Sequence, residues 1–148
     1  MRGGKKSMKA LVCSLCGIVG GTVAYLFGGW NDSIITLLIF MTIDYISGLI
    51  VAGVFKKSPK SQTGALESGA SWKGLVKKGY SLLIIVVANR LDCQLGTAFV
   101  RDSVTIAFIT SELISILENA GLMGIPLPKV LHKAIDILNT KEDEYGNL

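Results

Sequence analysis

Histidine and cysteine are scarce in this sequence, and their scarcity limits the chemistry that the chain can support. The single histidine, His132, cannot form an imidazole metal centre by itself. Cys13 and Cys16 form a C-x-x-C pattern inside an apolar run, which is typical of small residues in a membrane helix, and Cys93 stands alone. No phosphate-binding loop, zinc-protease motif or nucleophile elbow occurs. The sequence therefore predicts no enzyme, no metal site and no cofactor.

Charge is also in short supply, which argues against a soluble domain. Only 18% of the 148 residues are charged, whereas 50% are hydrophobic. A soluble domain of this size needs more polar residues because much of its surface faces water. A helix that crosses a bilayer needs about 20 apolar residues, and four segments approach or reach this length. They comprise residues 10–29, 34–55, 75–95 and 99–120. The sequence predicts an all-α integral membrane protein with four transmembrane helices, whose main partner is the lipid bilayer and not a nucleic acid.

The basic residues predict the orientation of these helices. Lysine and arginine gather in residues 1–9, in the loop 56–74 and after the fourth span, whereas the two other loops contain neither. Basic loops stay on the cytoplasmic side of a membrane. We therefore expect both termini in the cytoplasm, with 1–9 as a basic N-terminal segment. The same basic segment followed by an apolar run is also typical of a signal peptide, so cleavage within the first span stays open.

The residues after the fourth span follow a different pattern. The sequence GIPLP ends the span, because proline disfavours helical geometry in the residue before it. Apolar residues then recur at helical spacing over 126–139, which predicts a short amphipathic helix on the cytoplasmic membrane surface. Packing over the lysine-rich loop is the alternative. Residues 140–148 form an acidic tail.

Charged residues inside the predicted spans are the candidate functional residues. Asp44, Arg90 and Glu112 fall at similar depths, and each isolated charge would cost about 2.5–3.5 kcal/mol at the centre of a helix. We therefore expect these three side chains to form an acid–base cluster. The fourth span adds a polar stripe at helical spacing, which includes Ser115, Glu118 and Asn119. The stripe either fixes helix packing or lines water when the protein assembles, and the sequence leaves both interpretations open.

Small residues provide candidate packing faces. Gly17 and Gly21 form a G-x-x-x-G pattern in the first span, and Gly48 and Ala52 continue the four-residue spacing from Asp44 in the second. Such faces let helices approach closely in lipid. The contacts can form within one subunit or between subunits.

Three sequence blocks carry a resemblance to a known family. They are IDYISGLIVAGVFKK, SGASWKGLVKKGYSLLIIVVANRLD and ELISILENAGLMGIPLPKVL. Together they resemble the toxin-secretion/phage-lysis holins of Gram-positive phages and prophages, including clostridial toxin-export holins. Two features depart from the family: the loop is longer and more polar, and Arg90 has no counterpart. The family pattern falls on Asp44, Gly48, Ser68, Gly74, Lys78, Glu112, Ser115, Glu118, Asn119, Pro126 and Pro128.

The resemblance implies a function that the residues alone do not reveal. Holins of this kind form homo-oligomers in the cytoplasmic membrane of the bacterial host and open lesions that release an endolysin or a toxin. An antiholin can be a further partner. The alternatives are a small oligomeric ion channel or transporter, in which the polar cluster conducts, and an antiholin or membrane scaffold that forms no lesion.

Overall fold

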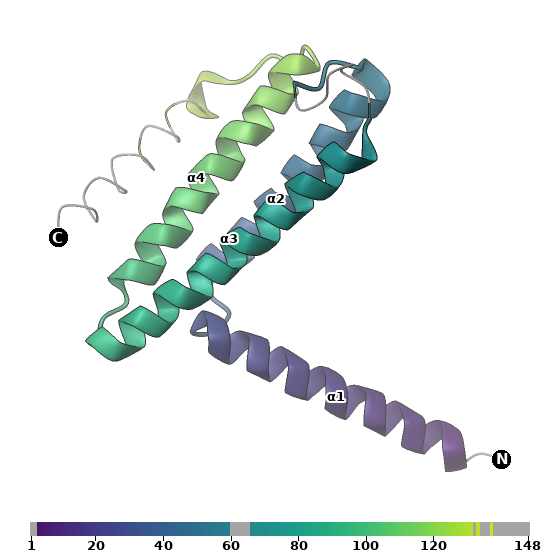
Figure 1. The fold of residues 1–148 in the computed structure, drawn as a ribbon, viewed down its shortest axis with the longest axis vertical. Helices are drawn as coiled ribbons and strands as arrows, with labels where there is room; N and C mark the ends of the chain where they lie inside the picture. Colours follow the sequence, from purple (N-terminus) through teal and green to yellow (C-terminus); the bar gives the residue numbers. More distant parts are fainter. Residues whose placement is uncertain (1–2, 60–65, 132, 134–136, 138–148) are drawn as a thin grey trace. The chain divides into compact units, whose positions relative to one another are not determined.

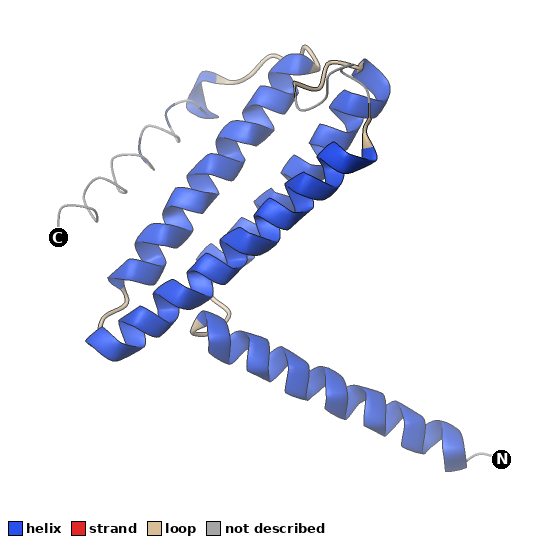
Figure 2. Ribbon diagram, viewed as in Figure 1, coloured by secondary structure: helices blue, strands red, loops and turns tan. Residues whose placement is uncertain are grey.

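The computed structural model describes residues 3–59, 66–131, 133 and 137, and it divides the chain into two compact units (Figure 1). Met1–Trp30 form the first unit and Asn31–Leu148 the second. Every regular element in the described part is helical (Figure 2), which confirms the predicted all-α class. The elements are α1 (Gly3–Phe27), α2 (Asp32–Ile50), the π-helical turn η1 (Val51–Phe55), α3 (Ser68–Leu95) and α4 (Phe99–Leu122).

Two helical segments in the described residues are long and apolar enough to cross a membrane. They are Met8–Phe27 of α1 and Asp32–Phe55, which combines α2 with η1. The helices α3 and α4 do not meet this criterion of length and apolar composition, because charged and polar residues interrupt their apolar runs. The chain thus has two candidate membrane spans by composition, and the four-span arrangement with cytoplasmic termini stays a prediction.

The first unit is one helix with a glycine turn at its end. Gly28 and Gly29 have positive φ angles of 75° and 102°, which glycine adopts without a steric cost. The amide of Gly29 donates to the carbonyl of Ala24 at 2.8 Å and closes the turn. Gly17 and Gly21 have no packing partner within this single helix. Their predicted role in helix association therefore remains a prediction.

The second unit begins with a side-chain cap on α2. Asn31 has extended backbone angles, and its Oδ1 accepts a hydrogen bond from the amide of Ile34 at 2.9 Å. This bond satisfies one of the amides that the first turn of a helix leaves without a partner. Asp32 places a negative charge in the same turn, where the helix dipole favours it.

Asn31→Ala is expected to lower the free energy of unfolding by about 1 kcal/mol, because alanine cannot accept the Ile34 amide hydrogen. SDS titration of the protein in detergent micelles, followed by far-UV circular dichroism, measures this difference. Asn31→Asp keeps an acceptor at the same position and should retain most of the stability. Equal losses in the two variants would contradict the capping role.

In the second unit, α4 packs against both α2 and α3, while α2 and α3 contact each other least. Fully buried side chains come from α2, η1 and α3, and they meet the apolar face of α4. They include Ile34, Leu37, Val51 and Ile85, together with Ile109, Leu113 and Leu117 of α4. The core of this unit is therefore a layer of branched aliphatic side chains between three helices, of which α3 runs opposite to α2 and α4.

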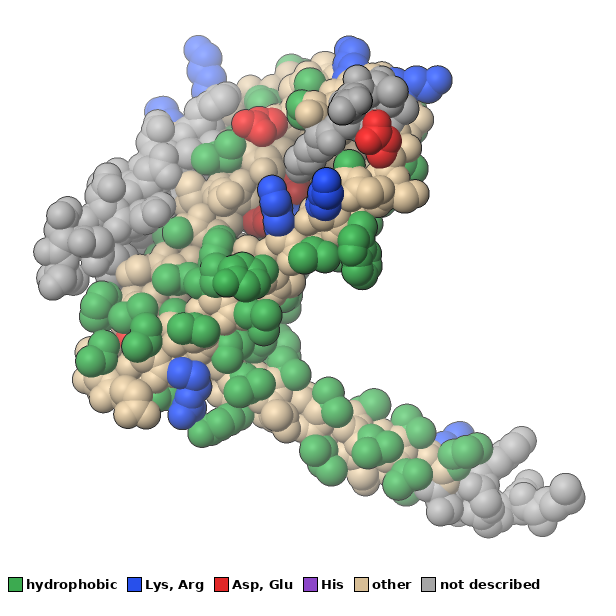
Figure 3. Space-filling model, in the orientation of Figure 1, with side chains coloured by type: hydrophobic (Ala, Val, Ile, Leu, Met, Phe, Trp, Pro, Cys, Tyr) green, Lys and Arg blue, Asp and Glu red, His purple; other side chains and the backbone are tan. Residues whose placement is uncertain are grey.

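The outer surface of the second unit is also apolar. On α2, exposed isoleucines recur at helical spacing, and α3 carries a similar exposed row. Hydrophobic side chains accordingly cover much of the surface in the view of Figure 3. Rows of this size on the outside of a helix favour contact with lipid or with another protein. The exposed residues are Ile35, Ile39, Ile43, Ile46 and Ile50 on α2, and Leu83, Val87 and Leu91 on α3.

Three chain segments meet at one end of the second unit: the end of η1, the start of α3 and the end of α4 (Figure 1). Most of the basic side chains visible on this unit lie toward that end (Figure 3). The helix α3 begins at Ser68, seven residues before the expected start of the third span. No proline interrupts 68–74, so the helix starts earlier than expected and includes Lys73 in addition to Lys77 and Lys78.

The end of α4 agrees with the break expected from GIPLP. Gly124 has a φ of 78°, and Pro126 and Pro128 lie in the non-helical segment that follows. The backbone is helical again at Lys129–Leu131, Lys133 and Ile137. The remainder of the predicted amphipathic helix 126–139, including His132, and the acidic tail 140–148 lie outside the described residues.

Candidate functional site

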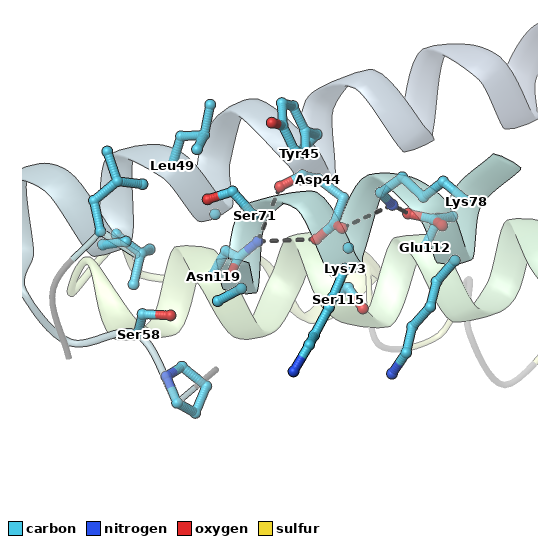
Figure 4. Close-up of a pocket in the computed structure, with 18 of the residues that line it drawn as sticks. Asp44, Tyr45, Leu49, Ser58, Ser71, Lys73, Lys78, Glu112, Ser115 and Asn119 are labelled. Carbon is cyan, nitrogen blue, oxygen red and sulfur yellow. Dashed lines mark hydrogen bonds and ion pairs between the residues drawn. The ribbon is translucent and has the colours of Figure 1, made fainter. Parts of the chain in front are cut away.

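Three charged side chains meet where α2, α3 and α4 face one another. The ammonium of Lys78 on α3 lies 2.8 Å from Oδ2 of Asp44 on α2, and it also pairs with Oε2 of Glu112 on α4 (Figure 4). All three side chains are largely buried, with exposed fractions of 6% for Asp44, 14% for Lys78 and 13% for Glu112. One lysine therefore links all three helices. Asp44, Lys78 and Glu112 are called the ion cluster below.

Asn119 supports the ion cluster from the end of α4. Its Nδ2 donates to Oδ1 of Asp44 at 2.9 Å and to Oγ of Ser47 at 2.9 Å. The hydroxyl of Ser47 in turn donates to the carbonyl of Asp44 at 3.0 Å. Both oxygens of Asp44 thus have partners, which is what a buried carboxylate requires. The spacing between Glu112 and Asn119, two turns of one helix, is what lets α4 contact Asp44 and Lys78 together.

The predicted pairing with Arg90 is wrong, because Lys78 is the cation that pairs with Asp44 and Glu112. Arg90 follows Lys78 by 12 residues on the same helix, a rise of about 18 Å, and its side chain is exposed. The buried positions of α3 are Ile85, Ala88, Asn89 and Asp92. Lys78 lies seven residues, or two turns, before the buried Ile85, so both side chains lie on the same face of α3. The spacing of the buried residues therefore indicates Lys78, and not Arg90, as the cation that faces the bundle.

The other predicted site residues divide between the cluster and its surroundings. Ser115 lines the cavity beside the cluster, which is described below, whereas Glu118 is exposed. Gly48 lies beside the cluster, where a Cβ would come within 3.8 Å of Nδ2 of Asn119. Ala52 is buried in η1. Among the family-matched residues, Gly74 lines the same cavity and Ser68 is the first residue of α3. Pro126 and Pro128 follow α4.

A cavity of about 650 Å³ lies beside the ion cluster, between the three helices (Figure 4). Asp44, Lys78 and Glu112 form part of its wall. The rest of the wall combines apolar side chains, such as Leu49 and Phe108, with serines, namely Ser71 and Ser81 on α3 and Ser111 and Ser115 on α4. Lys73 and Lys77 also line it and are exposed. A cavity with this many polar partners is large enough and polar enough to hold water.

A second polar network, which the sequence analysis missed, joins the end of α3 to the start of α4. Asp92 is 3% exposed and accepts hydrogen bonds from the hydroxyl of Thr97 and from two amides at the start of α4, those of Val100 and Arg101. Ala98, at the N-cap position, has no side chain that could accept them. Asp92 therefore serves as the N-terminal cap of α4 from the preceding helix.

The chemistry of the site is that of a buried network of ion pairs. No group of three or more His, Cys, Asp or Glu residues in the described part of the chain is placed to hold a metal ion. The ion cluster carries two carboxylates and one ammonium, a formal charge of −1, and all three side chains are largely buried between the helices. Such a group holds helices together while it stays dry, and it attracts water when the helices separate.

Comparison with known proteins gives consistent matches along most of the chain. Residues 21–140 match the bacteriophage holin family. An uncharacterized protein of Clostridium perfringens (strain 13 / Type A) is 36% identical over 137 residues, which cover 90% of this chain and 96% of that protein. An uncharacterized protein of Halalkalibacterium halodurans is 33% identical over 143 residues, covering 93% and 100%.

One relative has a functional name. A probable holin of Bacillus phage phi105 is 32% identical over 122 residues, which cover 82% of this chain and 84% of that protein. No solved structure matches the chain. The family match includes α2, α3 and α4 entirely and therefore the whole ion cluster. With a family match over most of its length and a phage relative that is 32% identical over 82% of it, the chain belongs to the bacteriophage holin family.

Proposed function

We propose that the protein is a holin that oligomerises in the bacterial cytoplasmic membrane and opens lesions there. The lesions would release an endolysin in phage lysis or a toxin in secretion. Membership of the bacteriophage holin family supports this function. The partners are the lipid bilayer, further copies of the same chain and, where one exists, an antiholin.

The proposed topology has four membrane spans with both termini in the cytoplasm. Residues 10–29, 34–55, 75–95 and 99–120 would span the bilayer, and 126–139 would lie on its cytoplasmic surface before the tail 140–148. The exposed aliphatic rows on α2 and α3 support this arrangement, because they suit a lipid environment. The lysines at one end of the second unit suit the cytoplasmic side.

The observation that carries the proposal is the ion cluster inside the α2–α4 bundle. A membrane protein that needed only to pack would place apolar residues there, since a charged side chain at mid-membrane is costly. Asp44, Lys78 and Glu112 neutralise one another only in part, so they favour water once neighbouring helices separate. In an assembled lesion these side chains and the serines beside them would face the water-filled interior.

Inducible expression in a bacterium that contains a folded fluorescent reporter in its cytoplasm tests this function. Growth, membrane potential and reporter release across the cytoplasmic membrane are followed against time after induction. Abrupt growth arrest with release of the folded reporter is the expected result. Depolarisation without release would instead indicate a small ion-conducting assembly. Normal growth despite confirmed membrane insertion would indicate an antiholin or scaffold.

A further inference from the structure

The ion cluster contains two carboxylates but only one ammonium group. Lys78 contacts both carboxylates, so each of Asp44 and Glu112 shares one ammonium with the other. The hydrogen bonds of Asn119 go to Asp44 and not to Glu112. The closed bundle therefore contains one negative charge in excess, and Lys78 alone keeps the two carboxylates from facing each other unopposed.

The position of Lys78 is also where the bundle is held together most weakly. The helices α2 and α3 contact each other far less than either contacts α4, and the ion pair of Asp44 with Lys78 joins them directly. The cavity that borders this pair is lined by serine hydroxyls from α3 and α4. Water that enters between α2 and α3 would reach the carboxylates first, with polar partners already present.

We propose that Lys78 restrains lesion formation by neutralising the two carboxylates, so that Lys78 delays opening whereas Asp44 and Glu112 promote it. The inference rests on the proposed holin function and adds its regulation. It predicts changes of opposite sign within one cluster. Removing the lysine leaves two excess negative charges and should cause early opening. Removing one carboxylate leaves a neutral pair and should cause late opening. A cluster that served only for packing would give changes of the same sign.

Lys78→Met and Glu112→Gln are the two informative variants, and Lys57→Met is the matched control. Lys57 follows η1, is exposed, carries the same charge at the same end of the bundle and does not line the cavity. Lys57→Met thus reproduces the loss of a basic residue without changing the cluster or the cavity wall. In the inducible system we expect Lys78→Met to arrest growth earlier than the wild type, Glu112→Gln later, and Lys57→Met on the wild-type schedule. Immunoblots of the membrane fraction confirm equal amounts of protein.

A second measurement reports on the cluster without depending on lesion formation. Ser115 lines the cavity, so Ser115→Cys places a thiol beside the cluster after Cys13, Cys16 and Cys93 have been replaced by serine. Inside-out membrane vesicles expose the cytoplasmic face to a membrane-impermeant maleimide. We expect Lys78→Met to raise the labelling rate of this thiol about tenfold, the ratio that corresponds to about 1.4 kcal/mol. Glu112→Gln should lower the rate, and Lys57→Met should leave it unchanged.

The outcomes separate this inference from the proposed function. Shifts of the same sign in Lys78→Met and Glu112→Gln, or an equal effect of Lys57→Met, would overturn the restraining role even if the wild type releases the reporter. Failure of the wild type to release the reporter would overturn the holin function, while the labelling rates still test the restraint. If Lys78→Met does not accumulate in the membrane, Glu112→Gln decides, because early or unchanged opening of that variant contradicts the proposal.

Discussion

Replacing Asp44 or Glu112 by alanine is expected to reduce reporter release strongly while membrane insertion continues. Either change leaves Lys78 opposite a single carboxylate, so the excess charge that attracts water to the bundle is lost. Insertion should persist because an aspartate at the centre of a membrane helix costs about 2.5–3.5 kcal/mol, and alanine removes this cost. The variants should therefore accumulate in the membrane as packed bundles that open poorly.

Asp32→Ala is the control for both variants, since Asp32 is an exposed carboxylate in the first turn of α2 and lies outside the ion cluster. Release of the folded reporter is compared at equal membrane abundance. We expect Asp44→Ala and Glu112→Ala to reduce release by about tenfold or more, a ratio that corresponds to about 1.4 kcal/mol. Asp32→Ala should release the reporter as the wild type does. Release on the wild-type schedule by both cluster variants would mean that the polar cluster has no role in lesion formation.

The two carboxylates of the cluster could be predicted from the sequence, whereas depth in the membrane alone does not identify their cation, Lys78. Asp44 and Glu112 stand out because each interrupts an apolar segment. Arg90 is the cation that a residue count from the expected cytoplasmic ends of the spans places at a depth similar to that of Asp44 and Glu112. The helix α3, however, is 28 residues long and begins at Ser68, before the expected span. The rotation of each residue about the helix axis, and not its distance from an assumed boundary, decides which side chains meet.

The two ends of α4 differ in how far they can be predicted from the sequence. The end of α4 and the break at Gly124 follow from glycine and proline, whose effects on the backbone are local. The cap of α4 is different, because its acceptor, Asp92, belongs to the preceding helix and meets the amides only through the turn at Gly96. A search for a capping residue at Ala98 finds none. Contacts that depend on how two helices turn back on each other are not visible in a local sequence pattern.

Asp92→Ala is expected to destabilise the α3–α4 connection by about 3 kcal/mol, more than the loss of an ordinary cap, which costs about 1 kcal/mol. The change leaves the hydroxyl of Thr97 and the amides of Val100 and Arg101 without their acceptor. Because Asp92 is almost completely buried, water cannot readily replace the lost carboxylate. The free energy of unfolding in detergent micelles, from SDS titration followed by circular dichroism, measures the effect.

Asp102→Ala provides the comparison, because Asp102 lies in the first turn of the same helix but its side chain is 43% exposed. It pairs with Arg101 at 2.8 Å, and a pair this exposed should contribute less than about 1 kcal/mol. Asp92→Asn keeps one oxygen acceptor and should fall between the two. Equal losses for Asp92→Ala and Asp102→Ala would show that any negative charge near the start of α4 suffices. A larger loss for Asp92→Ala would mean that the buried carboxylate fixes where α4 begins, and with it the register that brings Glu112 and Asn119 to the ion cluster.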